Sequence, residues 1–343
     1  MNHYNTGKNP GTLAMTDVFF TTDVEIWCRG WNNLDREFPR AFRQYIHGTT
    51  PRGEFGLPFQ LRLLNDPRRR LAFFVEPLFA LRFGLQPLTE IVGLIQEAGQ
   101  EVQLHLHPEW VDEAPEPPLP SVTRKRPYLR DYSLEEQTIL IREGKALLER
   151  AGAPTPVAFR AGSYGMNSDT LHALRANDIL FDSSYNACYQ GLDSGVAPGQ
   201  LLFQPNQQFG VHEYPITVFQ DRPDHYRHVQ LGACGFRELA GVMTHASRHG
   251  WDSVVIVSHS FELLDPNQDV ADWIVIRRFR QLCRFLARRR DELPTRHFME
   301  LSPTREHAPQ PAPFRGAPLH TGWRMLEQAL RPVQYRLQAA GSG

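Results

Sequence analysis

The chain has 343 residues, of which 41% are hydrophobic and 22% are charged; this composition is typical of a globular protein that can bury a sizeable core. Its formal net charge of −1 argues against a protein whose main role is to coat nucleic acid or an anionic membrane. The four cysteines form no C-x-x-C pair, so we expect neither a zinc ribbon nor a disulfide framework. The N-terminus lacks a signal-peptide pattern, and no apolar run reaches the roughly 18 residues of a membrane span. These features predict a cytoplasmic protein without a transmembrane segment.

Strand and helix patterns alternate along most of the chain. Seven apolar, β-rich runs are expected to form strands, at residues 17–27, 70–77, 101–107, 156–162, 178–184, 211–219 and 253–260. Helical patterns occupy residues 87–100, 133–152, 168–177, 236–250 and 272–290. This alternation is typical of parallel β-α-β units. It predicts an α/β fold with a seven-stranded (β/α) barrel, a distorted relative of the TIM barrel.

The sequence also predicts where the barrel begins and ends. Residues 1–15 are polar and contain glycine and proline, so we expect a flexible N-terminal tail. The barrel is expected to span residues 16–302. Residues 303–343 are rich in proline and then weakly helical, and they form a C-terminal extension to which the sequence assigns no role.

Polar side chains collect where the predicted strands end. In parallel α/β proteins the carboxyl ends of the strands meet on the side of the fold that carries the site. Each of these residues alone has an ordinary explanation, such as a solvated carboxylate or a surface arginine, but five strand ends that present complementary groups would be a rare coincidence. His212 and Glu213, at the start of the sixth predicted strand, are interpreted as rim residues. The candidate site therefore consists of Asp23, Glu25, His105, His107, Arg160, Asp182 and His259.

The spacing within two of these strand ends favours metal binding. Residues two positions apart on a strand point to the same face, so Asp23 can share a centre with Glu25, and His105 with His107. Carboxylate oxygens together with two imidazole nitrogens suit a borderline divalent ion and leave one coordination position for water. We therefore predict a divalent metal cofactor, with Zn²⁺ as the first choice and Co²⁺, Ni²⁺ or Mn²⁺ as alternatives.

The order of the motifs resembles that of a known family. The segments FFTTDVEIW, LAFFVEP, EAGQEVQLHLHPEW, AFRAGSYGMN, ILFDSSYN and VVIVSHS follow one another along the chain. Together they resemble the polysaccharide deacetylase family (carbohydrate esterase family 4, the chitooligosaccharide deacetylase homology domain) over residues 17–265. The resemblance implies a metal-dependent hydrolase that removes an acetyl group from the amide nitrogen of an N-acetylated sugar or saccharide intermediate. Since a signal peptide is not expected, it also suggests a role in the biosynthesis of cell-surface polysaccharide.

The resemblance also implies a role for each residue of the site. Asp23 would be the general base, oriented by Arg160, and His259 would be the general acid that protonates the departing amine. Backbone N–H groups of the Ser163–Tyr164 turn would hold the oxyanion. Asp182 corresponds to the aspartate of the family's fifth strand and is counted with the catalytic residues. Glu25, His105 and His107 would hold the metal.

Two departures from the family pattern concern the metal ligands. The usual second histidine lies four residues after the first, where this chain has Glu109, and the usual second aspartate is replaced by Val24. The sequence leaves open whether His107 or Glu109 completes the ligand set. We favour His107 because it lies on the same strand face as His105.

Two other functions remain open from the sequence. The segment AGSYG, residues 161–165, resembles a nucleophile elbow, and Ser163, Asp182 and His259 occur in the order expected for a serine hydrolase. The second alternative is a non-catalytic carbohydrate-binding barrel that has lost its metal. The expected partner is a carbohydrate substrate with an N-acyl group rather than nucleic acid, and residues 27–62 and 111–132 are expected to shape specificity.

Overall fold

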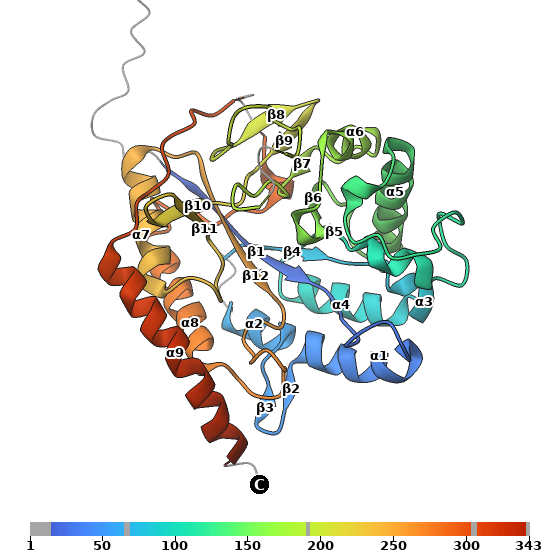
Figure 1. The fold of residues 1–343 in the computed structure, drawn as a ribbon, viewed down its shortest axis with the longest axis horizontal. Coiled ribbons are helices and arrows are strands. Elements are labelled where there is room, and N and C mark those ends of the chain that lie inside the picture. The colour runs from blue at the N-terminus through green and yellow to red at the C-terminus, as the bar shows by residue number, and fades with distance from the viewer. Residues whose placement is uncertain (1–14, 65–68, 190–192, 303–306, 341–343) are drawn as a thin grey trace, which may run out of the picture.

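A curled sheet of eight strands forms the centre of the molecule (Figure 1), in the order β12-β1-β4-β5-β6-β7-β9-β8. The computed structural model describes residues 15–64, 69–189, 193–302 and 307–340, so the predicted N-terminal tail, apart from Met15, lies outside the described residues. The strands of this sheet are β1 Asp17–Val24, β4 Leu71–Val75, β5 Glu101–Leu106, β6 Ala158–Ala161, β7 Phe181–Asp182, β8 Asn206–Gln208, β9 Val211–Glu213 and β12 Ser253–His259.

The predicted α/β architecture is confirmed, but the strand count and the closure differ. All seven predicted strands contribute to the sheet, and the neighbours from β12 through β9 run parallel. The eighth strand, β8, pairs antiparallel with β9. Among the described residues no strand pairing joins β8 to β12, so the sheet is an open half-barrel rather than a closed seven-stranded one.

The sixth predicted strand is divided. Only β9 at its start belongs to the central sheet, and the chain then leaves the sheet at Pro215, which lacks the N–H that a central strand needs. Residues from Val218 onward form a separate hairpin of β10 Val218–Arg222 and β11 His225–His228.

All five predicted helices are present and lie around the outside of the sheet (Figure 1). Their starts follow ordinary capping chemistry: Ser133 Oγ accepts the Glu136 N–H at 3.2 Å, and Glu136 Oε2 accepts the Ser133 N–H at 3.0 Å. The helices are α4 Gln86–Glu97, α5 Leu134–Arg150, α6 Ser168–Ala176, α7 Phe236–His249 and α8 Trp273–Arg288.

Short elements fill the connections that the sequence did not resolve. Between β1 and β4 the chain forms α1 Leu34–Phe42, the π-helix η1 Arg43–His47, the hairpin of β2 Thr49–Thr50 and β3 Gly53–Glu54, and α2 Leu57–Leu63. The remaining short elements are α3 Ala80–Phe83 and the 3₁₀-helices η2 Pro108–Glu113, η3 Leu129–Asp131, η4 Gly162–Tyr164 and η5 Phe298–Glu300.

The C-terminal extension ends in a helix, α9 Pro318–Ala340, that crosses α7 and α8 (Figure 1). Its Arg324 Nε donates to Glu238 of α7 at 3.0 Å, and its Glu327 accepts from Arg278 of α8 at 2.6 Å. Within the described part of the chain, none of the helices combines the length and the apolar character that crossing a bilayer requires.

Side chains alternate between two cores along each central strand. In β1, Val18 and Phe20 pack into the large core under the helices, whereas Phe19 belongs to a smaller core inside the curl of the sheet. The same period of two places Leu104 and Leu106 of β5 in the outer core. The residues that alternate with these outer-core residues therefore face the inside of the half-barrel. In β1 this holds for every second residue counted from Phe19.

Candidate active site

Strand register brings the predicted site residues together. Asp23 of β1 lies beside His259 of β12, and His105 of β5 lies beside Arg160 of β6. Because all four strands run parallel, their carboxyl ends meet at one edge. Alternation then turns Asp23, His105 and Arg160 to the inner face, opposite to Leu104 and the other outer-core residues.

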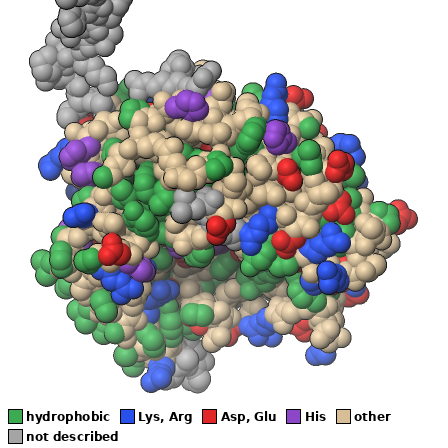
Figure 2. Space-filling model, turned by 45° about the horizontal axis from the view of Figure 1, so that its top comes forward, with side chains coloured by type: hydrophobic (Ala, Val, Ile, Leu, Met, Phe, Trp, Pro, Cys, Tyr) green, Lys and Arg blue, Asp and Glu red, His purple; other side chains and the backbone are tan. Residues whose placement is uncertain are grey.

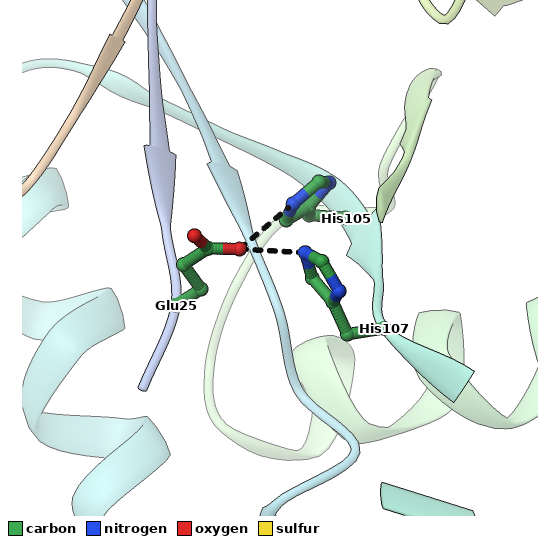
Figure 3. Close-up of side chains that lie close together, drawn as sticks. All are labelled: Glu25, His105 and His107. Carbon is green, nitrogen blue, oxygen red and sulfur yellow. Dashed lines mark ion pairs between the residues drawn. The ribbon is translucent and has the colours of Figure 1, made fainter. Parts of the chain in front are cut away.

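A carboxylate and two imidazoles converge just beyond the ends of β1 and β5 (Figure 3). Glu25 Oε2 lies 2.6 Å from His107 Nε2 and 3.5 Å from His105 Nε2. The donor atoms of these three residues all lie within 4.8 Å of one another, and all three side chains are buried. Glu109 is not a member of this group, so the geometry favours His107 over Glu109 as the partner of His105.

Hydrogen bonding and charge fix the protonation of the imidazoles and of the carboxylate in this group. His105 Nδ1 lies 2.7 Å from the backbone oxygen of Arg160, which can only accept, so Nδ1 carries a proton and Nε2 is the ring nitrogen that faces Glu25. Burial alone would raise the pKa of Glu25, but His107 and His105 outweigh it and hold that pKa well below its usual value. Burial lowers the pKa of His107, but the Glu25 carboxylate raises it more strongly, to about 10. Without a cation, the buried carboxylate thus requires a protonated imidazole as its counter-charge.

The donor set and its surroundings fit a divalent metal ion. One carboxylate and two imidazoles are three of the four ligands of a typical catalytic zinc site, which leaves one position open. The cradle is also closely fitted, because a Cβ atom on Gly162 would lie only 2.6 Å from the His107 ring. Only glycine allows the β6–η4 turn to approach this imidazole so closely.

Asp23 is held by a fully buried arginine. Arg160 Nη1 donates to Asp23 Oδ1 at 2.6 Å and to Thr21 Oγ1 at 2.8 Å. The other guanidinium nitrogens donate to Ser183, and the group stacks 4.3 Å from the centre of the Phe74 ring. All of these contacts fix the guanidinium in one orientation, and Asp23 Oδ2 is left as the oxygen that can accept a proton.

His259 stands at the end of a hydrogen-bonded chain that sequence reasoning missed. Glu262 Oε1 accepts from Gln230 Nε2 at 2.6 Å, which fixes the orientation of that amide. The same Nε2 lies 3.4 Å from His259 Nδ1, and Gln230 Oε1 lies 2.7 Å from His228 Nε2. Because the amide nitrogen donates to Nδ1, His259 carries its proton on Nε2. Gln230 and Glu262 lie in loops rather than at strand ends, so the strand pattern of the sequence does not indicate them.

The turn after β6 has a left-handed backbone conformation at two consecutive residues. Ser163 has φ 51° and Tyr164 has φ 55°, so consecutive residues adopt the left-handed conformation. Burial and the nearby Asp23 carboxylate raise the pKa of Tyr164, which therefore stays protonated. Tyr164 also stacks on Tyr189, with ring centroids 5.4 Å apart. The turn thus borders Asp23 on one side and an aromatic surface on the other.

Asp182 and Glu213 form a buried carboxyl pair behind the site. Asp182 Oδ1 accepts from Ser184 Oγ at 2.6 Å, and Glu213 Oε1 accepts the Tyr185 N–H at 3.1 Å. Burial and the proximity of Asp182 raise the pKa of Glu213 well above its usual value, so the pair shares a proton. The interpretation of Glu213 as a rim residue is wrong: β9 lies beside β7 in the sheet, which turns Glu213 inward.

The serine-hydrolase arrangement is not assembled. Asp182 is bonded to Ser184, and His259 Nδ1 faces Gln230, so neither serves the other as in a catalytic triad. Asp182 is likewise absent from the group around Glu25. Of the predicted residues, the structure joins Glu25 with His105 and His107 and joins Asp23 with Arg160, whereas Asp182 supports the strands from behind.

Sequence reasoning also missed a buried acid, whereas an aromatic contact of the site comes from the stretch of residues 27–62 that was expected to shape specificity. Glu76 is fully buried after β4, where its carboxyl accepts the Leu78 N–H at 2.8 Å, and burial raises its pKa to about 8. Trp27 meets His107 edge-on with ring centroids 4.7 Å apart. Glu76 directly follows an apolar strand, and this position could have indicated a buried acid. Because Pro77 comes next, the segment looked like an ordinary strand end.

Comparisons with known proteins agree at the level of the fold. No protein-family model and no curated protein matches the chain. Among solved structures, a protein assigned as a polysaccharide deacetylase from Mycobacterium smegmatis is 19% identical with a TM-score of 0.51, covering 83% of this chain and 88% of its own. The predicted resemblance is thus confirmed for the fold: the chain has the fold of that polysaccharide deacetylase.

Two further solved structures have lower similarity. A family 4 carbohydrate esterase from Streptomyces lividans is 12% identical with a TM-score of 0.41, and covers 82% of this chain and 92% of its own. A family 4 pseudoenzyme from Bacillus anthracis is 10% identical with a TM-score of 0.41, and covers 83% of this chain and 65% of its own. At these scores neither structure supports an argument about this chain.

Proposed function

We propose that the chain is a divergent polysaccharide deacetylase: a metal-dependent hydrolase that removes an acetyl group from the amide nitrogen of an N-acetylated saccharide. The observation that carries the proposal is the buried Glu25–His105–His107 group beside the Asp23–Arg160 pair. A structural histidine pair would not need a second buried carboxylate, held by its own arginine, on β1, the strand that leads to Glu25. The half-barrel fold supports the proposal independently.

Glu25, His105 and His107 would hold the divalent ion, for which zinc is the first choice. When bound there, such an ion supplies Lewis acidity for a water molecule and for the substrate carbonyl. It also removes the need for a protonated His107 beside Glu25, because the cation then balances the buried carboxylate.

The chain's own residues perform the proton transfers. Asp23 Oδ2 takes a proton from the attacking water, while Arg160 keeps Oδ1 in place at 2.6 Å. Backbone N–H groups of Ser163 and Tyr164 stabilise the charge that develops on the carbonyl oxygen. His259 then protonates the departing amine from Nε2; it does so as the imidazolium ion, because a neutral ring would be left as an imidazolate, so in that step Nδ1 is also protonated and its contact with Gln230 is given up. Asp182 acts only indirectly, through Ser184 and the backbone of Ala161.

Aromatic residues around the site suit a saccharide. Trp31 packs edge-on against Trp110, and Lys125 lies 3.6 Å above the Trp31 ring. Lys125 also bonds to the backbone oxygen of Glu109 at 2.7 Å, which ties the loop of residues 111–132 to the end of β5. We assign Trp31, Lys125 and Trp27, which lies against His107, to substrate selection, with the buried Trp110 behind them. Exchange of these loops without any change in substrate preference would remove this assignment.

The proposal is tested by metal content and acetate release measured together. Full-length wild type is expected to contain about one equivalent of a divalent metal and to release acetate from N-acetylated oligosaccharides. His105→Ala combined with His107→Ala should lose the metal and the activity, whereas Glu109→Ala is the matched control that keeps the metal. A folded wild type that binds no added zinc would overturn the proposal.

A second variant separates catalysis from metal binding. Asp23→Asn preserves the shape of the side chain and should retain the metal while turnover falls by about 10²–10⁴-fold, the usual contribution of a general base. Wild type that holds metal but releases no acetate from any N-acetylated saccharide would refute the proposed catalysis, whereas a folded, metal-free wild type that still binds such saccharides would support the carbohydrate-binding barrel that has lost its metal.

A further inference from the structure

Helix α9 exposes a continuous row of large hydrophobic side chains. The six residues of this apolar stripe are 44–75% exposed, and they follow one another at alternating spacings of four and three, which places them on one helical face. A helix on the surface of a globular protein normally turns such a face inward, and a large exposed apolar patch marks a binding surface. The apolar stripe consists of Leu319, Trp323, Leu326, Leu330, Val333 and Leu337.

The opposite face of α9 is polar and is fixed to the barrel. Arg324 is 4% exposed and bonds to Glu238 and to Asp221, both at 3.0 Å. Further along the helix, Arg331 pairs with Asp272, the N-cap of α8, at 2.5 Å. Because these ion pairs are buried or half-buried, the helix cannot roll over to hide its apolar stripe without leaving charges unpaired. The exposure is therefore built into the fold.

Cations surround the apolar stripe. The only carboxylate of α9, Glu327, is neutralised by Arg278. Arg237 of α7 lies 4.9 Å above the Trp323 ring, and Arg315 and Arg336 are exposed near the two ends of the helix. The neighbouring α8 carries a separate exposed row at Arg277, Arg280 and Arg284, of which Arg280 stands over the Phe59 ring of α2. In Figure 2 hydrophobic and basic side chains are intermixed on the lower left, where α9 lies in Figure 1.

We propose that α9 binds flat on the surface of an anionic phospholipid bilayer. The apolar stripe would enter the boundary between headgroups and acyl chains, and the flanking arginines would pair with lipid phosphates. The net charge of −1 does not predict this affinity, because the arginines are concentrated locally. A second copy of the chain fits less well, since two such helices would bring unpaired arginines together without a free carboxylate on either.

The position of α9 relates this surface to the candidate site. Its ion pairs join it to Glu238 and Asp272, at the N-terminal ends of α7 and α8. In β-α units these helix ends lie on the side where the strands end, which is also the side of Glu25, His105 and His107. Bilayer binding would thus bring the candidate site close to saccharides displayed at a membrane. The proposal does not rest on the deacetylase assignment, because vesicle binding is measured without turnover.

The test is co-sedimentation of the full chain with lipid vesicles. Wild type should bind vesicles of phosphatidylcholine mixed with phosphatidylglycerol, bind pure phosphatidylcholine much less, and release at high salt. Leu326→Glu combined with Leu330→Glu should lower the partition coefficient by at least about tenfold, because it removes two of the six apolar anchors. The matched control is Leu180→Glu combined with Met299→Glu, which adds the same two charges at side chains that are 40% and 49% exposed outside the extension.

Folding and self-association are checked on the same samples. Both variants should keep the wild-type circular dichroism spectrum, because the altered side chains are exposed. Wild type that stays in the supernatant with every vesicle would overturn the proposal. A wild-type dimer that Leu326→Glu with Leu330→Glu converts to monomer, without any vesicle binding, would also overturn it and would assign the apolar stripe to a second copy of the chain.

Discussion

Replacement of Gly162 by alanine tests whether the His107 imidazole is placed by the β6–η4 turn. The new Cβ would lie 2.6 Å from Nδ1 and Cε1 of His107 and 2.7 Å from the backbone oxygen of Leu106, whereas ordinary contacts begin at 3.4 Å. The imidazole must therefore move by about 0.8 Å, since the strand backbone is less free to yield. Metal–ligand distances tolerate changes of only about 0.2 Å. We expect metal affinity to fall by about 10–100-fold, as it does when a residue that hydrogen-bonds to a metal ligand is lost. We also expect the free energy of unfolding to fall by about 1–3 kcal/mol.

The assay is calorimetric zinc titration of the metal-free protein, together with urea unfolding. Gly93→Ala is the matched control, because the new Cβ on this α4 residue meets nothing within 4 Å. In the control, zinc affinity should be unchanged, and the stability should rise by up to about 1 kcal/mol from the better helix propensity of alanine. Equal zinc affinity in Gly162→Ala and Gly93→Ala would refute the assignment of His107 as a ligand.

Three further predictions concern buried charges. Arg160→Met should lower the free energy of unfolding by about 3–5 kcal/mol in urea titration, because Asp23 would keep a buried charge without its partner; a loss below about 1 kcal/mol would contradict this. Glu213→Gln should change stability by less than about 1.5 kcal/mol, because Glu213 beside Asp182 is already uncharged, and a larger loss would show that it is ionised. Burial lowers the pKa of His297 from 6.5 to about 4, so the unfolded chain binds this proton first on acidification. The free energy of unfolding should then fall by at most about 3 kcal/mol between pH 6.5 and pH 4, and His297→Gln should flatten this part of the profile.

The parts of the site that the sequence predicted are those set by strand periodicity. Alternation along β1 and β5 puts Glu25 and His107 on the face of Asp23 and His105, and the parallel arrangement brings the two strand ends to one edge. These two rules need no knowledge of the loops. They were therefore enough to predict the Glu25–His105–His107 group, which the structure brings together.

The parts that the sequence did not predict depend on contacts between distant segments. Glu213 looked like a rim residue because its burial depends on β9 lying beside β7, which no local pattern encodes. Gln230 and Glu262 reach His259 from two loops that follow different strands. The stretch around α1 lacked a clear period because Pro39 lies inside that helix. Loop conformation and strand neighbours are settled by tertiary packing, and a single sequence carries little information about them.

The two departures from the family pattern compensate each other in space. On β1, Val24 is 1% exposed and packs in the outer core, so an acid at that position would face away from the site. The acid is instead one residue later, and the longer side chain of Glu25 carries its carboxylate beyond the strand end to within 2.6 Å of His107 Nε2. On β5 the second imidazole is two residues after His105 rather than four, which keeps it on the same face and at the height of Glu25. In this structure the carboxylate of Glu25 and the second imidazole meet, so we interpret the Asp-x-Glu and His-x-His motifs as one rearranged candidate ligand set.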